Sequence, residues 1–494
     1  MTRRARASRY VLMPPSDRYR ADPLFADLGG EFADPVAAAR FPQHVLRRRN
    51  QAWARDIGLD TLSDEEWIGH MARFAPLPSN MPTPLAMRYH GHQFRTYNPD
   101  LGDGRGFLFA QLRDSTGRLL DLGTKGSGQT PYSRRGDGRL TLKGGVREVL
   151  AAEMLEAIGV YTSKALSLVE TGEALVRGDE PSPTRSSVLV RLQHSHIRFG
   201  TFQRLAYLER PDLMRVLIAH CAEAYYPEHA ALEGEAQAAA LMGEIVEASG
   251  RLAASWMAAG FVHGVLNTDN LNVTGESFDY GPWRFLPYSD PGFTAAYFDE
   301  TGLYAFGRQP EAVSWALAQL GGALSLICPV AKLEDALKLY VPAFQQKLRE
   351  RLFARLGLAS GDFAQDLAFI QALFDWLSET RAGWAQFFHD WRAGAASEAR
   401  AQQSPQAALY EQASFTPIRD GLAARTGADA AALLTHPHWA QSHAASLVIE
   451  EVEALWAPIA ERDDWTLFEA KLAEIDSLKQ ALGIECHALV AHGA

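Results

Sequence analysis

Two short apolar segments lie between residues 106 and 125, and a turn separates them. The first segment, GFLFAQLRD, precedes the turn residues STG, and the second segment, RLLDLGTK, follows them. Short apolar runs bounded by turn residues are typical of β-strands. The pattern therefore predicts a β-hairpin over residues 106–125, and SVLVRLQ at residues 187–193 predicts another strand.

A helical period follows the predicted hairpin. In GGVREVLAAEMLEAIG, apolar residues recur every four positions from Val146 to Ile158, and Gly159 can end the helix. This spacing predicts a helix over residues 144–159. Apolar residues in FPQHVLRRRNQAWARDIGL recur at roughly helical spacing as well, so we also expect a helix within residues 41–59.

The second half of the chain is dominated by helical patterns. Residues 205–260 show them, and beyond residue 310 the chain is alanine-rich and mostly helical in pattern to its end. The aromatic segments FDWLSE and FFHDW lie at helical spacing and are expected to form core. The segment RAGAASEARAQQSPQ, residues 392–406, has the composition of a linker.

Composition and charge exclude several classes of protein. The chain has 494 residues, 47% hydrophobic and 22% charged, with a net charge of −11, which argues against binding nucleic acid mainly by phosphate neutralisation. No apolar run approaches the length of a membrane span. Cys221, Cys328 and Cys486 are too far apart to signal a zinc site or a disulfide framework. The basic start, residues 1–10, lacks an apolar secretory core. We expect a cytoplasmic protein with no membrane and no nucleic-acid partner.

Several residues appear in the order of a kinase nucleotide site. The segment LGDGRG supplies Gly102, Gly104 and Gly106, whose main chain can approach phosphate closely. Lys125 ends the second predicted strand, and Glu148 lies on the following predicted helix. A kinase uses a strand lysine to bind phosphate and a helix glutamate to orient that lysine. The order therefore favours a nucleotide site over unrelated surface charges.

The segment HGVLNTDN resembles the metal-binding loop of small-molecule kinases, which reads H-G-D-x-x-x-x-N. His263, Gly264 and Asn270 keep that spacing, but Val265 stands at the place of the catalytic aspartate. Asn270 and the later Asp279 offer the oxygen ligands that Mg²⁺ prefers. Loss of a positioned base costs about 10²–10⁴ in rate. The sequence therefore predicts metal and ATP binding without ordinary kinase chemistry.

Two explanations fit a nucleotide site without its usual base. The chain is either a silent binding module or an enzyme that presents a different phosphorus atom to the acceptor. Asp269, beside Asn270, is a spare carboxylate that could accept a proton, although an aspartate in a turn is often a local acceptor only. Arg191 and Arg198, in VRLQHSHIRFG, have apolar neighbours, and buried arginines usually need an anion. Phosphate and an internal carboxylate are both candidates for that anion.

At this point the motifs resemble those of the selenoprotein O family. The matching segments, in order, are YHGHQF, LGDGRG, TKGSGQTPYSRRGDGR, VREVLAAE, RLQHSHIRFGTF, HGVLNTDN and DYGP. Members of this family are kinase-like proteins that transfer AMP from ATP to hydroxyl side chains of other proteins. The resemblance implies a nucleotide bound in the reverse sense, with its α-phosphate facing the acceptor. On this reading the aspartate replaced by Val265 is not needed.

The resemblance also implies the roles of individual residues. Gly102, Gly104 and Arg105 would contact ATP, Lys125 would grip phosphate with Glu148 orienting it, Asp137 and Gly138 would complete the nucleotide pocket, Arg191 and Arg198 would hold the inverted phosphates, Asn270 and Asp279 would bind Mg²⁺ or Mn²⁺, and Asp269 would act as the catalytic base.

These observations lead to one main prediction. We expect an α+β protein with a protein-kinase-like two-lobed core, divided into an N-terminal extension (1–84), a nucleotide-binding N-lobe (85–204), a C-lobe with the metal site (205–330) and a helical C-terminal region (331–494). The expected activity is metal-dependent protein adenylylation of Ser, Thr or Tyr hydroxyls by a monomer. A conventional kinase that transfers γ-phosphate and a silent ATP-binding pseudokinase scaffold are the alternatives.

Two further expectations concern histidine and cysteine. His90 and His92 could suggest a metal pair, but no third ligand at matching spacing accompanies them, so structural roles are expected. The C-terminal segment holds one cysteine, Cys486, which makes the redox-active tail of many family members doubtful here.

Overall fold

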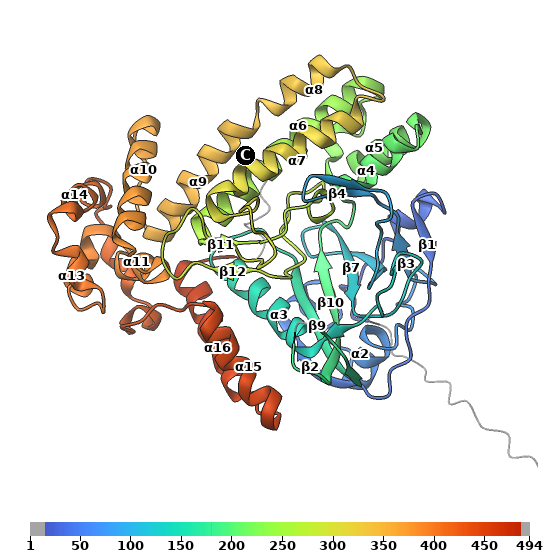
Figure 1. Ribbon diagram of the computed structural model, residues 1–494, viewed down its shortest axis with the longest axis horizontal. Coiled ribbons are helices and arrows are strands. Elements are labelled where there is room, and N and C mark those ends of the chain that lie inside the picture. The colour runs from blue at the N-terminus through green and yellow to red at the C-terminus, as the bar shows by residue number, and fades with distance from the viewer. Residues whose placement is uncertain (1–14, 179, 486–494) are drawn as a thin grey trace, which may run out of the picture. The chain divides into compact units, whose positions relative to one another are not determined.

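The computed structural model describes residues 15–178 and 180–485 (Figure 1). The expectations for residues 1–10 and for Cys486 lie outside the described residues. The chain divides into two compact units. A sheet unit comprises Met1–Met87, Asp103–Leu142 and Ala165–Leu192, and a helical unit comprises Arg88–Gly102, Lys143–Lys164 and Gln193–Ala494.

The sheet unit is built on a single large sheet. Within the described residues this sheet has eight strands in the order β1-β3-β6-β7-β10-β9-β2, and β8 pairs with β10 off this path. Each neighbouring pair for which the register is known is antiparallel. The strands are β1 (Ala33–Pro35), β2 (Val45–Arg49), β3 (Leu85–Met87), β6 (Leu108–Arg113), β7 (Leu119–Lys125), β8 (Leu140–Thr141), β9 (Lys164–Leu175) and β10 (Thr184–Gln193), and the helices are η1 (Leu24–Leu28), α1 (Gln51–Asp56) and α2 (Asp64–Met71).

The predicted hairpin is confirmed. Strands β6 and β7 pair antiparallel from Leu108 opposite Gly123 to Arg113 opposite Leu119. Asp114 closes the turn, because its Oδ1 accepts hydrogen bonds from the main-chain N–H groups of Thr116, at 2.9 Å, and Arg118, at 3.0 Å. Every residue of β7 is buried. The strand predicted at residues 187–193 is also confirmed, as part of β10.

The helix predicted within residues 41–59 is only partly present, because the first part of the segment is strand β2. That strand pairs antiparallel with β9. Helix α1 begins after Asn50, whose side chain caps it by accepting a hydrogen bond from the Trp53 N–H at 3.2 Å. Pairing with a strand more than a hundred residues away decided the structure, and apolar spacing within the segment could not reveal it.

The helical unit confirms the helical patterns read from the sequence. Helix α3 covers the predicted segment 144–159. The elements of this unit are β4 (Gly91–Gln93), β5 (Thr96–Asn98), α3 (Leu142–Ala157), α4 (Phe199–Tyr207), α5 (Pro211–Tyr225), α6 (Gly234–Ala259), β11 (Phe261–Val262), β12 (Arg284–Phe285), α7 (Gln309–Leu324), α8 (Val330–Leu337), α9 (Tyr340–Leu356), α10 (Phe363–Thr380), α11 (Trp384–Asp390), α12 (Glu398–Ala401), α13 (Ala407–Tyr410), α14 (Thr416–Ala424), α15 (Ile449–Arg462) and α16 (Thr466–Leu482). Among the described residues, no helix is both long enough and apolar enough to cross a membrane.

The aromatic core predicted near residues 375–391 is confirmed, but the linker predicted at residues 392–406 is wrong. Trp376 and Trp391 belong to one buried cluster of this unit. Residues of the supposed linker are buried too, among them Arg392 and Ser397. The segment forms short helices whose small residues pack closely. Its alanines and serines therefore reflect tight packing, which has the same composition as a flexible linker.

Candidate active site

The sheet unit holds the glycine-rich loop before β6. A Cβ atom added to Gly106 would lie 1.9 Å from the Thr124 carbonyl oxygen, and one added to Gly104 would lie 2.9 Å from the Tyr132 carbonyl oxygen. Asp103 fixes the start of this loop, because its Oδ2 accepts a hydrogen bond from the Met87 N–H at 3.0 Å. Glycine is therefore required at residues 104 and 106 so that two stretches of main chain can pass each other.

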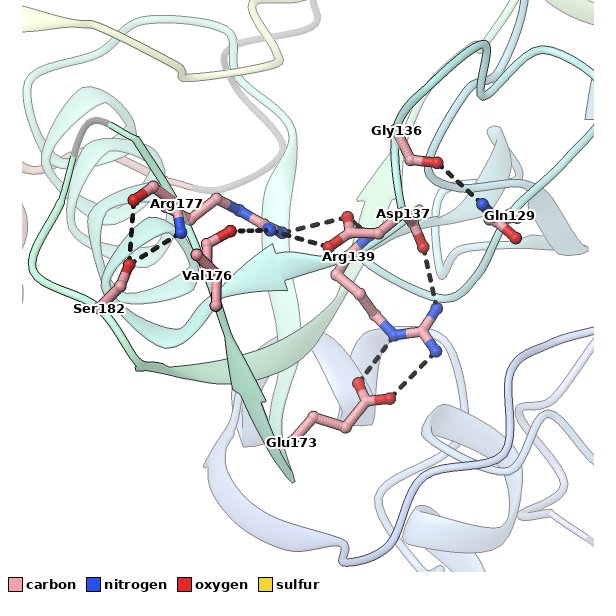
Figure 2. A network of polar contacts seen from close by, with 8 residues as sticks. All are labelled: Gln129, Gly136, Asp137, Arg139, Glu173, Val176, Arg177 and Ser182. Atoms are coloured by element: carbon pink, nitrogen blue, oxygen red, sulfur yellow. Dashed lines mark hydrogen bonds and ion pairs between the residues drawn. The ribbon is translucent and has the colours of Figure 1, made fainter.

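A second loop of the sheet unit, residues 126–139, folds back on itself. Gly138 has a φ of +70°, and a Cβ atom there would lie 2.2 Å from the carbonyl group of Gly128. The Gly128 N–H donates to the Gly138 carbonyl at 3.1 Å. The side chain of Gln129 donates to the Gly136 carbonyl at 2.9 Å (Figure 2). These contacts hold the loop in one conformation with its main chain exposed at residues 134–136.

Asp137 lies at the centre of a charged network in this loop. Figure 2 shows the Arg177 guanidinium directed at the Asp137 carboxylate, and the two ion-pair distances are 2.8 and 3.1 Å. Arg139 donates from its main-chain N–H to Asp137 at 3.0 Å and pairs through its side chain with Glu173 at 2.7 Å. Burial acts to raise the pKa of Asp137, but the hydrogen bonds and positive charges of the two arginines hold it below its ordinary value. The sequence reading missed Arg177 and Glu173, and no motif marks either residue.

The predicted phosphate-binding cations of the sheet unit differ in exposure. Lys125, at the end of β7, is 4% exposed, and Arg191, on β10, is 5% exposed. Arg105 is exposed, and within the described part of the chain no hydrogen bond or ion pair involves its guanidinium. Lys125 belongs to the sheet unit and its expected partner Glu148, which is 2% exposed, to the helical unit. Their pairing stays a prediction.

The helical unit carries the loop that the sequence marked as metal-binding. Its first residue, His263, is fully buried, and its Nε2 donates to the Phe278 carbonyl at 2.9 Å. The main-chain N–H of His263 donates to the side-chain oxygen of Gln309 at 3.0 Å. His263 thus joins the start of the loop to the segment just before Asp279, so it has a structural role here.

Asn270 is held by the main chain at the place where a kinase has its catalytic aspartate. Its Nδ2 donates to the Val265 carbonyl at 2.9 Å. No hydrogen bond within residues 15–178 and 180–485 uses its Oδ1, so that oxygen can serve as a metal ligand. Asp279, the second predicted ligand, is half-buried and has a φ of +63°. Aspartate is one of the few residue types that tolerate this backbone region.

Arg198 and Asp269 are brought together as part of the same loop. The Nη1 atom of Arg198 donates to the Asp269 carbonyl at 2.7 Å. The guanidinium also lies 4.6 Å from the ring centre of Tyr89 and 5.0 Å from that of Phe278. Arg198 is 6% exposed. It therefore orients the main chain of Asp269 in addition to the phosphate-binding role predicted for it.

A set of buried polar residues supports this loop, and the sequence reading missed them. The Thr268 hydroxyl accepts from the His92 N–H at 2.7 Å and donates to the Gln203 side chain at 2.7 Å. The Asn267 side chain accepts from the Tyr304 hydroxyl at 2.8 Å. Polar residues adjoining a metal-ligand motif are a signal for such support, but their partners are distant in sequence. His92, which accepts or donates only to side chains and main chain here, has the structural role expected of it.

Comparisons with known proteins agree with the motifs. The family described as "Protein adenylyltransferase SelO" matches residues 17–476 of the chain. The chain belongs to this SelO family. It is 46% identical over 457 residues to a protein nucleotidyltransferase YdiU of Gloeobacter violaceus, covering 90% of this chain and 93% of that protein. It is 50% identical over 380 residues to the protein of that name from Synechococcus elongatus, covering 75% of each.

The SelO match confirms the resemblance drawn from the motifs. It covers almost all described residues, so both the sheet unit and the helical unit belong to the family. A relative of the same name from Pseudomonas putida is 39% identical over 377 residues. The likeness to SelO proteins therefore extends well beyond the short motifs from which it was first inferred.

Proposed function

We propose that this chain is a protein adenylyltransferase with a kinase-like two-lobed core. The observation that supports this most is the loop from His263 to Asp279, which keeps a metal-type asparagine without the aspartate that a kinase uses as a base. Asn270 is tied to the Val265 main chain, and its Oδ1 is left for a ligand. Membership of the SelO family adds the activity, because the family is described as protein adenylyltransferases.

The reaction is the attack of a protein hydroxyl on the α-phosphorus of ATP. A bond forms between the hydroxyl oxygen and the α-phosphorus, and the bond from that phosphorus to the bridging oxygen of pyrophosphate breaks. Phosphoryl-type transfer depends on positioning and charge stabilisation more than on covalent help from the protein. A binding site that fixes the nucleotide in a reversed orientation therefore changes the product without new catalytic groups.

The residues of this chain divide between two tasks. Lys125, oriented by Glu148, and the arginines Arg191 and Arg198 would hold the phosphates, and their fixed charge would stabilise the departing pyrophosphate. Asp269 would take the proton from the Ser, Thr or Tyr hydroxyl. Burial fits these roles, since Lys125, Arg191 and Arg198 are each at most 6% exposed. Desolvated cations interact strongly with phosphate.

The glycine loops would form the rest of the nucleotide pocket. The main chain at Gly102, Gly104 and Arg105 is expected to contact ATP, as is the loop at Asp137 and Gly138. Close packing of glycines in both loops leaves main-chain groups able to approach phosphate. The Arg105 side chain is exposed and free to close on a bound nucleotide.

Asn270 and Asp279 would hold a divalent metal. Their amide and carboxylate oxygens suit Mg²⁺ or Mn²⁺, which both take oxygen ligands. The metal, when bound, would neutralise charge on the phosphates. The left-handed backbone at Asp279 and the bond from Asn270 to Val265 fix the main chain at both ligands. Both residues can therefore bind the metal with little rearrangement.

The test compares two labels on one substrate. The full chain is incubated with Mg²⁺ or Mn²⁺ and a protein acceptor, using ATP labelled either at the α-phosphate or at the γ-phosphate. Label from the α-phosphate alone is the expected result. Label from the γ-phosphate would make the chain a kinase that uses Asp269 as a displaced base, and no label with either would favour a silent scaffold. A parallel reaction with UTP labelled at the α-phosphate tests the preferred base.

A further inference from the structure

A small pocket lies inside the helical unit, away from every residue assigned to the candidate active site. Helices α9, α11 and α16 and the short helix η8 (Pro437–Ala440) line it. It encloses about 310 Å³, counted with the solvent at its mouth. Ile158, Phe388 and Leu478 provide apolar walls, whereas Arg355 and His438 provide polar ones. The pocket thus combines a hydrocarbon surface with nitrogen groups.

His438 is a buried histidine whose ring nitrogens both lack partners. The residue is 1% exposed, and within the described part of the chain neither Nδ1 nor Nε2 makes a hydrogen bond. Burial, followed by the nearby charges of His389, His436 and Arg400, lowers its pKa to about 4. The neutral ring has one N–H donor and one acceptor, and a buried donor without a partner is destabilising. A group outside the described protein structure is the natural partner for it.

Arg355 carries a positive charge into the same pocket. Its Nη1 donates to the Ala258 carbonyl at 2.8 Å, and its guanidinium lies 4.1 Å from the ring centre of Phe388. Burial lowers its pKa to about 9, so the group remains charged at neutral pH. No carboxylate of the described residues forms an ion pair with Arg355. Most of its five N–H donors are therefore available on the pocket side.

Two more arginines lie near the pocket and also lack a paired carboxylate among the described residues. Arg392 is 4% exposed and donates only to main-chain carbonyls of α9. Arg400 donates to the Trp439 carbonyl at 3.3 Å, and both guanidinium groups lie 5.7 Å from the centre of the Trp439 ring. The nearby Asp390 carboxylate accepts from the hydroxyl of Tyr410 at 2.7 Å. Positive charge therefore exceeds negative charge around the pocket.

We propose that this pocket binds a short-chain carboxylate. The carboxylate oxygens accept hydrogen bonds from Arg355 and His438, and the hydrocarbon part lies against Ile158 and Phe388. No aspartate or glutamate lines the pocket within the described residues, which disfavours a cation. A bare inorganic anion would gain nothing from the apolar walls. A guanidinium fork fits a carboxylate in bidentate geometry.

A neighbouring space gives room for the hydrocarbon part. A second pocket of about 330 Å³, counted in the same way, shares Ile158, Arg355, Ala385 and Ala445 with the first. Its other walls include Met154 and Leu286 and no acidic side chain within the described residues. Arg355 lines both spaces, so a carboxylate bound to it can extend its chain into either one.

The test measures binding of sodium butyrate to the full chain by calorimetry, with sodium chloride at equal ionic strength as the reference. Three variants are compared: Arg355→Met, His438→Phe and, as the control on the same helix, Lys347→Met outside the pocket. Saturable binding is expected in the wild type and the control. Loss of a hydrogen bond to a charged group predicts about 10–100-fold weaker binding in Arg355→Met, and loss of a single weaker bond predicts about 2–10-fold in His438→Phe.

His438→Phe keeps the test decisive if Arg355→Met affects folding. Arg355 also binds the Ala258 carbonyl, whereas no protein hydrogen bond of the described residues uses the His438 ring, so His438→Phe should fold at least as well as the wild type. Circular dichroism checks this for each variant. Absence of saturable butyrate heat would overturn the proposal, as would equal affinity in all four proteins. Binding of phosphate or chloride in place of butyrate would also overturn it.

Discussion

Arg198→Met should separate the loop-positioning role of this arginine from its charge. The change removes the hydrogen bond from the guanidinium to the Asp269 carbonyl, 2.7 Å long, and the contacts over Tyr89 and Phe278. A hydrogen bond from a charged donor contributes about 1.5–3 kcal/mol, and a cation–π contact contributes about 0.5–1 kcal/mol. Methionine keeps much of the volume. We therefore expect the free energy of unfolding to fall by about 2–4 kcal/mol.

Transfer should fall further than stability alone explains. The Asp269 carbonyl belongs to the residue proposed as the base, and a displacement of about 1 Å in a catalytic group can cost about 100-fold in rate. The assay is transfer from α-labelled ATP at a temperature at which the variant is folded, beside urea unfolding followed by circular dichroism. Arg198→Lys should restore only part of both, because an ammonium keeps the charge but not the planar fork.

Arg215→Met is the matched control. Arg215 is exposed on α5, and its one side-chain hydrogen bond among the described residues goes to the Pro211 carbonyl of the same helix. That variant should unfold and transfer like the wild type. If Arg198→Met also keeps the wild-type unfolding curve and the wild-type rate, then the contacts to Asp269 and the two rings do not matter, and the reasoning is wrong.

Three further changes test other parts of the structure. Asp279→Asn keeps a residue that tolerates the φ of +63°, so transfer should fall by at least about 100-fold with the fold intact; a near-normal Mn²⁺-dependent rate would remove Asp279 from the metal site. Gly138→Ala places a Cβ atom 2.2 Å from Gly128 and should cost about 1–3 kcal/mol and raise KM for ATP, and unchanged values of both would refute the role of this loop. Glu156→Gln breaks the buried ion pair with Lys164, 2.9 Å long, and should cost about 3–5 kcal/mol in urea unfolding at neutral pH. Burial acts to raise the pKa of Glu156, but the lysine charges hold it below 4.5, so the wild-type advantage should be present above about pH 4.5 and shrink as the pH falls through the folded-state pKa, whereas a constant advantage would contradict this.

The sequence predicted those parts of the fold that depend on local pattern. The hairpin at residues 106–125 and the helix α3 were readable because turn residues and apolar period lie within each segment. The failure at residues 41–59 has the opposite cause: β2 is fixed by pairing with β9, far away in sequence. The supposed linker after Trp391 failed because close packing and flexibility both favour small residues. Local composition cannot distinguish these two cases.

The candidate site was predictable to a similar degree. Motif spacing marked Asn270, Asp279 and Arg198, and the structure places Arg198 against the Asp269 main chain. The residues that hold them in place were not predictable, because Gln203 and Tyr304 contact the loop only after the chain has folded. Arg177 is a similar case, since forty residues separate it from Asp137.

The bond between Asn270 and Val265 explains how a kinase-like loop can lose its base and keep its metal ligand. Asn270 binds the carbonyl oxygen of Val265, and every amino acid supplies that group. The side chain at residue 265 is therefore free to change without moving the metal asparagine. Arg198 likewise binds the Asp269 main chain, so neither contact depends on the identity of the side chain it supports. A loop stabilised through its main chain can exchange one chemistry for another by substitution, and the valine at residue 265 is consistent with that route.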